Sequence, residues 1–159
     1  MGSDYLISHR WALTSRFAVT DETGAPHFEV RGRFALASKL SVCDATGTEV
    51  AVIVRQGLRR YQILAGGQET TVSARGFLGR SYDIDSSGGL LQARGDFSER
   101  QYSITRDGVP AAAVTQLRPL REQFAVQVTP EEDAVLMLAI VLVIETIRDN
   151  LRFAAVASS

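Results

Sequence analysis

A short phrase that returns about every twenty residues constrains the fold of this chain more than any other feature. The phrase is an aromatic residue or Leu, then any residue, then Val or Ile, and its starts are separated by 23, 21, 21, 20 and 22 residues. Large apolar residues two positions apart are typical of a β-strand with one buried face. The period therefore predicts a repeated β unit. The phrase occurs as Phe17-Ala-Val19, Leu40-Ser-Val42, Tyr61-Gln-Ile63, Tyr82-Asp-Ile84, Tyr102-Ser-Ile104 and Phe124-Ala-Val126.

Turn-forming residues follow the first five phrases. They are Asp21 to Gly24, Asp44 to Gly47, Gly66 with Gly67, Asp85 to Gly88, and Asp107 with Gly108. Asp can bond its own backbone and Gly accepts a positive φ, which tight reversals require. Each repeat is therefore predicted to be a β-hairpin. The returning arms are the runs at 27–30, 49–54, 70–72, 90–93 and 111–114.

The number of strands predicts how the sheet ends. Five hairpins supply ten strands, and runs at 5–8 and 123–128 raise the count to about twelve. An antiparallel meander of this size avoids two exposed edges by closing on itself. We therefore expect a mainly β fold, a closed antiparallel barrel of about twelve strands. Such a barrel is too wide for its own side chains to fill, so another element must occupy its centre.

The apolar run between Asp133 and Glu145 is the candidate for that element. Thr129 as a cap, Pro130 at the first helical position and Glu132 completing a capping box predict a helix over about 130–149; a core β-strand is the alternative. Eleven helical residues span about 17 Å, roughly half of a bilayer core, so the run is not transmembrane. An all-apolar helix must be buried on all sides. Its predicted core residues are Val135, Leu136, Leu138, Ile140, Val141, Leu142 and Ile144.

Composition narrows the functional classes. The chain has 159 residues, which suits one domain over 1–159 with a core of about 5–152. Its 17 basic and 18 acidic residues nearly balance, so the chain lacks the overall positive charge that is typical of a nucleic-acid-binding protein. A single cysteine, Cys43, and the absence of a secretory leader favour the cytoplasm. Among the basic residues only Lys39 is not Arg, which hints at GC-rich coding and a bacterial source.

Several motifs together resemble the LURP-one-related family. They are the phrase Gly95-Asp96-Phe97, the run Gln101 to Ile104, the turn Arg106 to Gly108, and Glu132-Asp133 before the apolar helix. This family belongs to the tubby C-terminal-like superfamily, which includes the phospholipid scramblases, and the resemblance extends from about Tyr5 to Arg152. It implies a twelve-stranded barrel with the C-terminal helix through its centre. Because tubby-like domains bind phosphoinositides and scramblases act at membranes, it also implies a role near anionic phospholipids.

Catalytic and metal-binding patterns are weak. The chain lacks a Gly-x-Ser-x-Gly elbow, a phosphate-binding Gly-Lys-Ser/Thr loop and a His-Glu-x-x-His motif. His9, His27 and Cys43 could form a nucleophile and base only if the fold brought them together. Glu145 is expected to pair with Arg148, which lies one helical turn further along. Gly95 is expected to relieve crowding at a bend, and Phe97 to anchor the hairpin that follows. We therefore expect a non-enzymatic domain with no cofactor and no metal.

A basic patch is the remaining candidate for a site. Arg31 and Arg33 alternate along one predicted strand, and Arg55, Arg59 and Arg60 cluster near the next link between hairpins. If the two groups lay on neighbouring strands, their guanidinium groups could bind anionic lipid headgroups at a membrane surface. Ordinary solubilising surface charge explains the same residues. The functional hypothesis is a cytoplasmic binding or scaffold domain, peripheral at the membrane if it binds lipid; the alternative is a protein-binding or structural domain with no lipid ligand.

Overall fold

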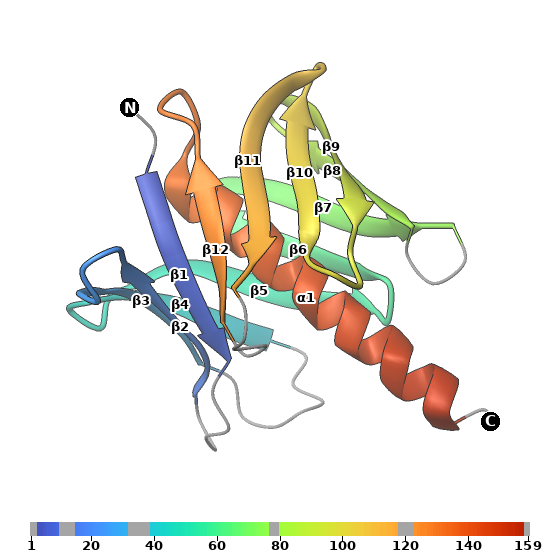
Figure 1. The fold of residues 1–159 in the computed structure, drawn as a ribbon, viewed down its shortest axis with the longest axis horizontal. Helices are drawn as coiled ribbons and strands as arrows, with labels where there is room; N and C mark the ends of the chain where they lie inside the picture. The colour runs from blue at the N-terminus through green and yellow to red at the C-terminus, as the bar shows by residue number, and fades with distance from the viewer. Residues whose placement is uncertain (1–2, 10–14, 32–38, 77–79, 118–122, 158–159) are drawn as a thin grey trace.

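Twelve antiparallel strands form the closed barrel that the hairpin period predicts. The computed structural model describes residues 3–9, 15–31, 39–76, 80–117 and 123–157. Each strand pairs with its neighbours in the chain, and β1 closes the ring on β12 (Figure 1). The strands are β1 (Ser3–His9), β2 (Ser15–Asp21), β3 (Pro26–Arg31), β4 (Lys39–Asp44), β5 (Glu49–Gly57), β6 (Arg60–Ala65), β7 (Gln68–Arg75), β8 (Ser81–Ser86), β9 (Gly89–Asp96), β10 (Gln101–Arg106), β11 (Val109–Gln116) and β12 (Gln123–Val128).

The repeated phrase forms the inner face of the even-numbered strands. In each phrase both large residues are buried and the residue between them points the other way, as the alternation of a strand requires. The register keeps these pairs opposite other core residues: Tyr61 faces Val72, and Ile63 faces Ile53. The period of about twenty residues is thus the length of one hairpin, and each repeat adds one inward-facing pair to the wall.

The turns behave largely as the sequence predicts. Asp21 Oδ1 accepts hydrogen bonds from the backbone amides of Thr23 and Ala25 at 2.9 and 3.0 Å, and Asp44 makes the same pair of bonds to Thr46 and Thr48. Asp85 differs, because it lies within β8 and the reversal falls on Ser87 and Gly88. The aspartates of the two long turns therefore shape the backbone, whereas Asp85 does not.

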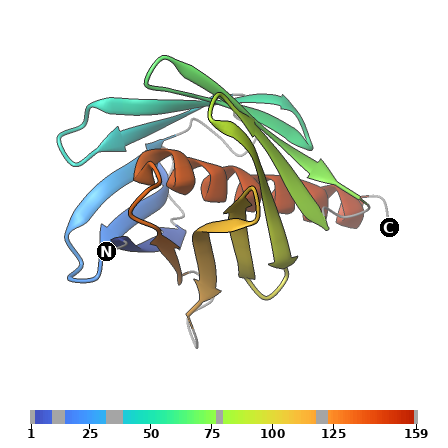
Figure 2. The same ribbon diagram turned by 90° about the horizontal axis from the view of Figure 1, so that it is seen from above.

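A single helix, α1 (Ala134–Ala157), runs through the barrel, with strands on both sides of it (Figure 2). It contacts β5, β6, β7, β11 and β12. The residues from Met137 to Ile144 are all at most 2 % exposed, and the fully buried side chains of the wall pack around them. The apolar run of α1 is therefore the core of the barrel, and the strands of the wall cover it. In the described part of the chain, no helix has both the length and the apolar character that crossing a membrane requires.

The predicted start of the helix was wrong by one turn. Residues 129–132 form a turn that is closed by the amide of Glu132 donating to the carbonyl of Thr129 at 3.2 Å. Asp133 is the actual N-cap, because its Oδ1 accepts from the amides of Val135 and Leu136 at 2.9 and 3.3 Å. The side chain of Glu132 cannot complete a capping box, since Arg106 holds both of its oxygens at 2.8 and 3.1 Å.

The other end of the helix also differs from the prediction. The sequence analysis ended the helix near Asp149, and α1 continues to Ala157. No Gly or Pro occurs in this extension, and Leu, Arg and Ala are good helix formers, so nothing in the sequence stops it. The final turns extend beyond the ring of strands (Figure 1).

Candidate functional site

The antiparallel barrel has two rims with different chemistry. The hairpin turns that follow the repeated phrases meet at the end where α1 begins, and the strand ends that join one hairpin to the next meet where α1 leaves (Figure 1). We call the first end the acidic rim: the turns after β2, β4, β6, β8 and β10, together with residues 129–133. We call the second end the basic rim: the facing ends of β3 and β4, β5 and β6, β7 and β8, and β9 and β10, with the part of α1 beyond Ile144.

Charged residues separate between these rims. Among the side chains that the structure describes, every Lys and Arg except Arg106 lies at the basic rim or on the strand halves leading to it. These cations are Arg31, Lys39, Arg55, Arg59, Arg60, Arg75, Arg80, Arg94, Arg100 and Arg148. The formal net charge of −1, which is summed over the whole chain, gives no sign of this separation.

The acidic residues show the opposite distribution. Most of them occupy the turns at the acidic rim or the strand ends beside those turns. They are Asp4, Asp21, Glu22, Asp44, Glu49, Glu69, Asp85, Asp107, Glu131, Glu132 and Asp133. The Thr23 hydroxyl, with support from His27 and two backbone amides, lowers the pKa of Asp21 to about 2. The Thr46 hydroxyl similarly lowers the pKa of Asp44, so both turn aspartates remain charged well into the acidic range.

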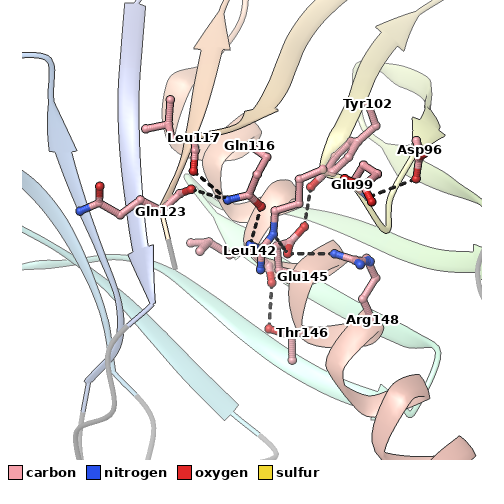
Figure 3. Close-up of polar contacts among 11 residues, drawn as sticks. Asp96, Glu99, Tyr102, Gln116, Leu117, Gln123, Leu142, Glu145, Thr146 and Arg148 are labelled. Atoms are coloured by element: carbon pink, nitrogen blue, oxygen red, sulfur yellow. Dashed lines mark hydrogen bonds and ion pairs between the residues drawn. The ribbon is translucent and has the colours of Figure 1, made fainter. Parts of the chain in front are cut away.

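A buried ion cluster closes the basic rim from the inside (Figure 3). Glu145 is only 2 % exposed on α1, and its Oε1 accepts from Arg100 Nε at 2.7 Å and from Arg148 Nη1 at 3.2 Å. Its Oε2 accepts from the Tyr102 hydroxyl at 3.0 Å. Burial, with the Glu145 charge beside it, raises the pKa of Tyr102 well above its usual range. The hydroxyl is therefore a permanent donor to the carboxylate.

The conformation of the turn before β10 directs the Arg100 side chain toward the Glu145 carboxylate. In the turn before β10, Asp96 Oδ1 accepts from Ser98 Oγ at 2.7 Å and from the Glu99 amide at 3.1 Å, and Arg100 itself has a φ of 51°. The Arg100 guanidinium lies 4.8 Å from the centre of the Phe124 ring and donates to Gln116 Oε1 at 3.0 Å. Arg100 thus joins β10, β11, β12 and α1 at one point.

Gly95 makes the approach of β9 to this turn feasible. Its φ is 141°, and a Cβ at this position would lie 2.5 Å from the Gln101 carbonyl oxygen. Phe97 is buried and packs between two rings of the wall, with centroids 4.9 Å from Tyr82 and 4.6 Å from Tyr102. The crowding at Gly95 and the anchoring by Phe97 are both as the sequence analysis expected.

The phenol groups of the repeated phrases surround the helix near the basic rim. The Tyr61 hydroxyl accepts a hydrogen bond from Asn150 Nδ2 at 2.9 Å. Tyr82 is fully buried, and burial raises its pKa to about 12. Its hydroxyl therefore stays protonated near neutral pH. This hydroxyl has no hydrogen-bond partner among the residues that the structure describes. The Tyr61 hydroxyl thus links β6 to α1, whereas the Tyr82 phenol only fills space in the core.

The structure places four of the five arginines of the predicted patch at the basic rim, and Arg33 lies outside the described residues. The condition that both groups lie on neighbouring strands is not met, because β4 separates β3 from β5. Arg31 follows an inward-facing residue of β3 and Arg60 precedes one of β6, so both side chains point outward. Arg55 instead lies on the same side of β5 as the buried residues Ala51 and Ile53. Arg59 donates to the Gly76 carbonyl. They share a rim and do not form one face of the sheet.

The helix residues singled out from the sequence fall into two groups. Leu138, Ile140, Val141, Leu142 and Ile144 are buried in the barrel, whereas Val135 and Leu136 are half-buried near the acidic rim. Their exposure follows from the position of the true N-cap, since α1 is only just entering the ring there. Met137, Val143 and Ile147 complete the buried stretch and were not among the predicted core residues.

Other candidates from the sequence have local partners. His27 lies 3.1 Å from Asp21 through Nε2 and packs edge-on against the Tyr5 ring, while Cys43 is buried in β4. The side chain of His9 lies outside the described residues. Within the described ranges, no group of three or more His, Cys, Asp or Glu side chains could hold a metal ion.

This architecture defines a class of protein: a twelve-stranded antiparallel barrel closed around its own C-terminal helix. The LURP-one-related family model matches residues 4–145, and the chain belongs to that family. An X-ray structure of a protein from Arabidopsis thaliana has the same fold, with a TM-score of 0.69 and 21 % identity over 95 % of this chain and 91 % of that one. Among curated proteins, no sequence match was found.

Proposed function

We propose that this LURP-one-related domain is a non-enzymatic binding module that docks its basic rim against anionic phospholipid headgroups, including phosphoinositides. The separation of charge between the rims carries this proposal. A Lys or Arg near an anionic leaflet contributes about 1 kcal/mol of attraction. The exposed side chains Arg60, Arg80 and Arg94 lie on adjoining hairpins of one rim and can approach the same plane together.

The separation of charge between the two rims also supports a particular orientation of the barrel on the membrane. The field of a protein with opposite charge at its two ends steers it toward a charged surface before contact. An anionic membrane attracts the basic rim and repels the acidic one, so the barrel axis should stand upright on the bilayer. The helix is committed to the core of the barrel from Met137 to Ile147, and docking therefore uses the rim and leaves the barrel closed.

The buried ion cluster inside the basic rim is consistent with a protein that binds a ligand without catalysing a reaction. The Glu145 carboxylate already accepts from Arg100, Arg148 and Tyr102, so its charge is compensated inside the fold. We further propose that the chain acts as one domain over 1–159, peripheral at the membrane on the cytoplasmic side and without a cofactor. A protein partner with an acidic surface is the alternative occupant of the rim.

Vesicle co-sedimentation tests the proposal. The full chain is mixed with phosphatidylcholine vesicles, and with the same vesicles containing phosphatidylserine or a phosphoinositide, in 50 mM and 300 mM salt. We expect pelleting only with the anionic vesicles and weaker pelleting at the higher salt, because exposed charges are screened. Equal, negligible pelleting with all three would refute lipid binding and leave the protein partner as the ligand of the rim.

Two variants of equal net charge separate rim binding from a global charge effect. Arg60→Gln with Arg80→Gln removes two exposed cations from the basic rim. The control, Ala45→Glu with Gln68→Glu, adds two anions to the acidic rim; Ala45 is the counterpart of Glu22 in the sister turn. In the first variant, removing two arginines should cost about 2 kcal/mol of binding free energy, which corresponds to roughly thirtyfold weaker vesicle binding. Similar losses in both variants would show that the rim is not the contact.

A further inference from the structure

An exposed leucine marks the tip of the turn that links β5 to β6 at the basic rim. Leu58 is 44 % exposed, and it is the single large hydrophobic side chain with such exposure at the basic rim in the described part of the chain. Arg59 and the exposed Arg60 follow it directly. Arg59 braces the turn by donating to the Gly76 carbonyl of the adjoining strand pair. The turn thus presents an apolar knob with cations beside it, and we call residues 58–60 the knob.

An open groove lies at the opposite end of the paired strands β5 and β6. It has a volume of about 340 Å³ and is bounded by the ends of β5, β6 and β7 and the turn at Gly66 and Gly67. Its apolar part is formed by Val50, Val52 and Leu64, of which Val52 and Leu64 are direct cross-strand partners. Leu64 also pairs with Glu69, so the apolar floor reaches an acidic edge.

Two carboxylates form the sides of this groove. Glu49 Oε2 accepts from Ser41 Oγ at 2.8 Å, and Glu69 Oε2 accepts from Gln62 Nε2 at 3.1 Å. These bonds hold the two carboxylates beside the groove. We call residues 49–52 and 64–69 the acidic groove. Its pattern, apolar in the middle and anionic at the sides, is the complement of the knob.

We infer that the acidic groove receives the knob of a second copy of this chain, which gives a head-to-tail contact. Leu58 enters the apolar floor between Val52 and Leu64, and Arg60 with its neighbour approaches Glu49 and Glu69. The knob and the groove lie at the two ends of the strand pair β5 and β6, so the contact is heterologous and does not saturate itself. Copies would add in a row along the direction of β5 and β6. This inference does not depend on lipid binding.

Sedimentation velocity of the full chain without lipid tests this contact. In 50 mM salt we expect the mean sedimentation coefficient of the wild type to rise with protein concentration, and to fall back toward the monomer value in 500 mM salt. Leu58→Asp should remove the knob, and Glu49→Arg with Glu69→Arg should remove the groove. Each variant alone should remain monomeric, because each lacks one half of the contact. All three positions are exposed, and thermal melting confirms that the variants fold; Leu58→Ser and the two Gln substitutions replace any variant that does not.

Mixing the two defective variants gives the decisive result. The Leu58→Asp chain keeps its groove and the groove variant keeps its knob, so an equimolar mixture should form a species of twice the monomer mass and nothing larger. The single change Ala45→Glu, on the acidic rim and outside the groove, should leave association unchanged. A wild type that stays monomeric at low salt, association that survives either variant, or a mixture without the dimer would overturn the inference. Because the groove variant keeps the basic rim, its vesicle binding should persist whatever the outcome here.

Discussion

At the scale of single residues, Glu145 is the most consequential charge in the barrel. The sequence analysis paired it with Arg148 as neighbours on a helix, and that ion pair is present at 3.2 Å. What the sequence could not show is that Arg100, 45 positions earlier, and Tyr102 converge on the same carboxylate. No local pattern encodes a contact between a turn residue with a positive φ and a helix, because the closed barrel alone brings them together.

Neutralising Glu145 should be costly. Glu145→Gln leaves Arg100 and Arg148 near each other without their shared anion, and breaking a buried ion pair from one side costs about 3 to 5 kcal/mol. Urea unfolding measures the loss of the free energy of unfolding. Asp149→Asn, on an exposed position four residues along the same helix, is the control and should change stability by less than about 0.5 kcal/mol. Similar small effects of both substitutions would contradict the cluster.

The turn aspartate Asp21 should make stability depend on pH in the acidic range. Its pKa in the folded protein is about 2, against 3.8 in the unfolded chain, so the folded state binds this proton less readily than the unfolded chain does. Its contribution is therefore complete above pH 3.8 and is lost as the pH falls through about 2. Thermal melts should show that Asp21→Asn lowers the melting temperature at pH 6 and has little effect near pH 2. A difference that stays constant across this range would argue against the lowered pKa.

At the scale of elements, the strands were predictable because each one carries its own signal. The phrase at Tyr61 with Ile63 alternates with outward residues, and Gly66 with Gly67 marks the reversal, so pattern and turn chemistry agree. The helix boundaries were less predictable. Thr129 and Glu132 have the spacing of a capping box. The side chain of Arg106, at the end of β10, binds the Glu132 carboxylate instead, and Asp133 is the cap. The ion pair between Arg106 and Glu132 therefore prevents the capping box that the local sequence predicts.

The position of the N-cap can be measured by two substitutions. Asp133→Ala removes the acceptor for the amides of Val135 and Leu136 and should lower the free energy of unfolding by about 1 kcal/mol. Thr129→Ala should have a smaller effect, because the Glu132 amide bonds to the Thr129 carbonyl, which the substitution keeps. Chemical denaturation of both variants gives the comparison. The reverse order of effects would restore Thr129 as the cap.

We expect folding of the barrel to require the helix, because its side chains form the centre of the core. Leu138 and Ile140 are 2 % and 0 % exposed, and a charge at either position would be buried without a partner. Leu138→Asp or Ile140→Asp should therefore prevent soluble folding, as measured by the soluble yield and by circular dichroism. Leu90→Asp, at a position that is 51 % exposed, is the control and should remain soluble. A soluble Leu138→Asp protein with an unchanged melting temperature would contradict the central-helix core.

At the scale of the whole molecule, charge is organised by topology. Asp and Glu recur in the turns after the phrases, while Arg recurs where one hairpin joins the next, so the hairpin period distributes charge as well as apolar residues. The acidic half of this alternation was visible in Asp21, Asp44 and Asp107 and was interpreted as turn chemistry alone. Its counterpart was interpreted as one patch of five arginines. The two sets lie at opposite ends because successive reversals of an antiparallel meander alternate between the ends of the strands.

The central claim, that the barrel docks upright on its basic rim, can be tested by energy transfer to the membrane. Ala45 and Leu58 lie beyond opposite ends of β5, a strand of nine residues and about 30 Å. A donor dye is attached to Ala45→Cys or Leu58→Cys in a Cys43→Ala background, and the acceptor is a labelled lipid in phosphoinositide vesicles. We predict efficient transfer from position 58 and weak transfer from position 45. Equal transfer from both positions, or stronger transfer from position 45, would contradict the account.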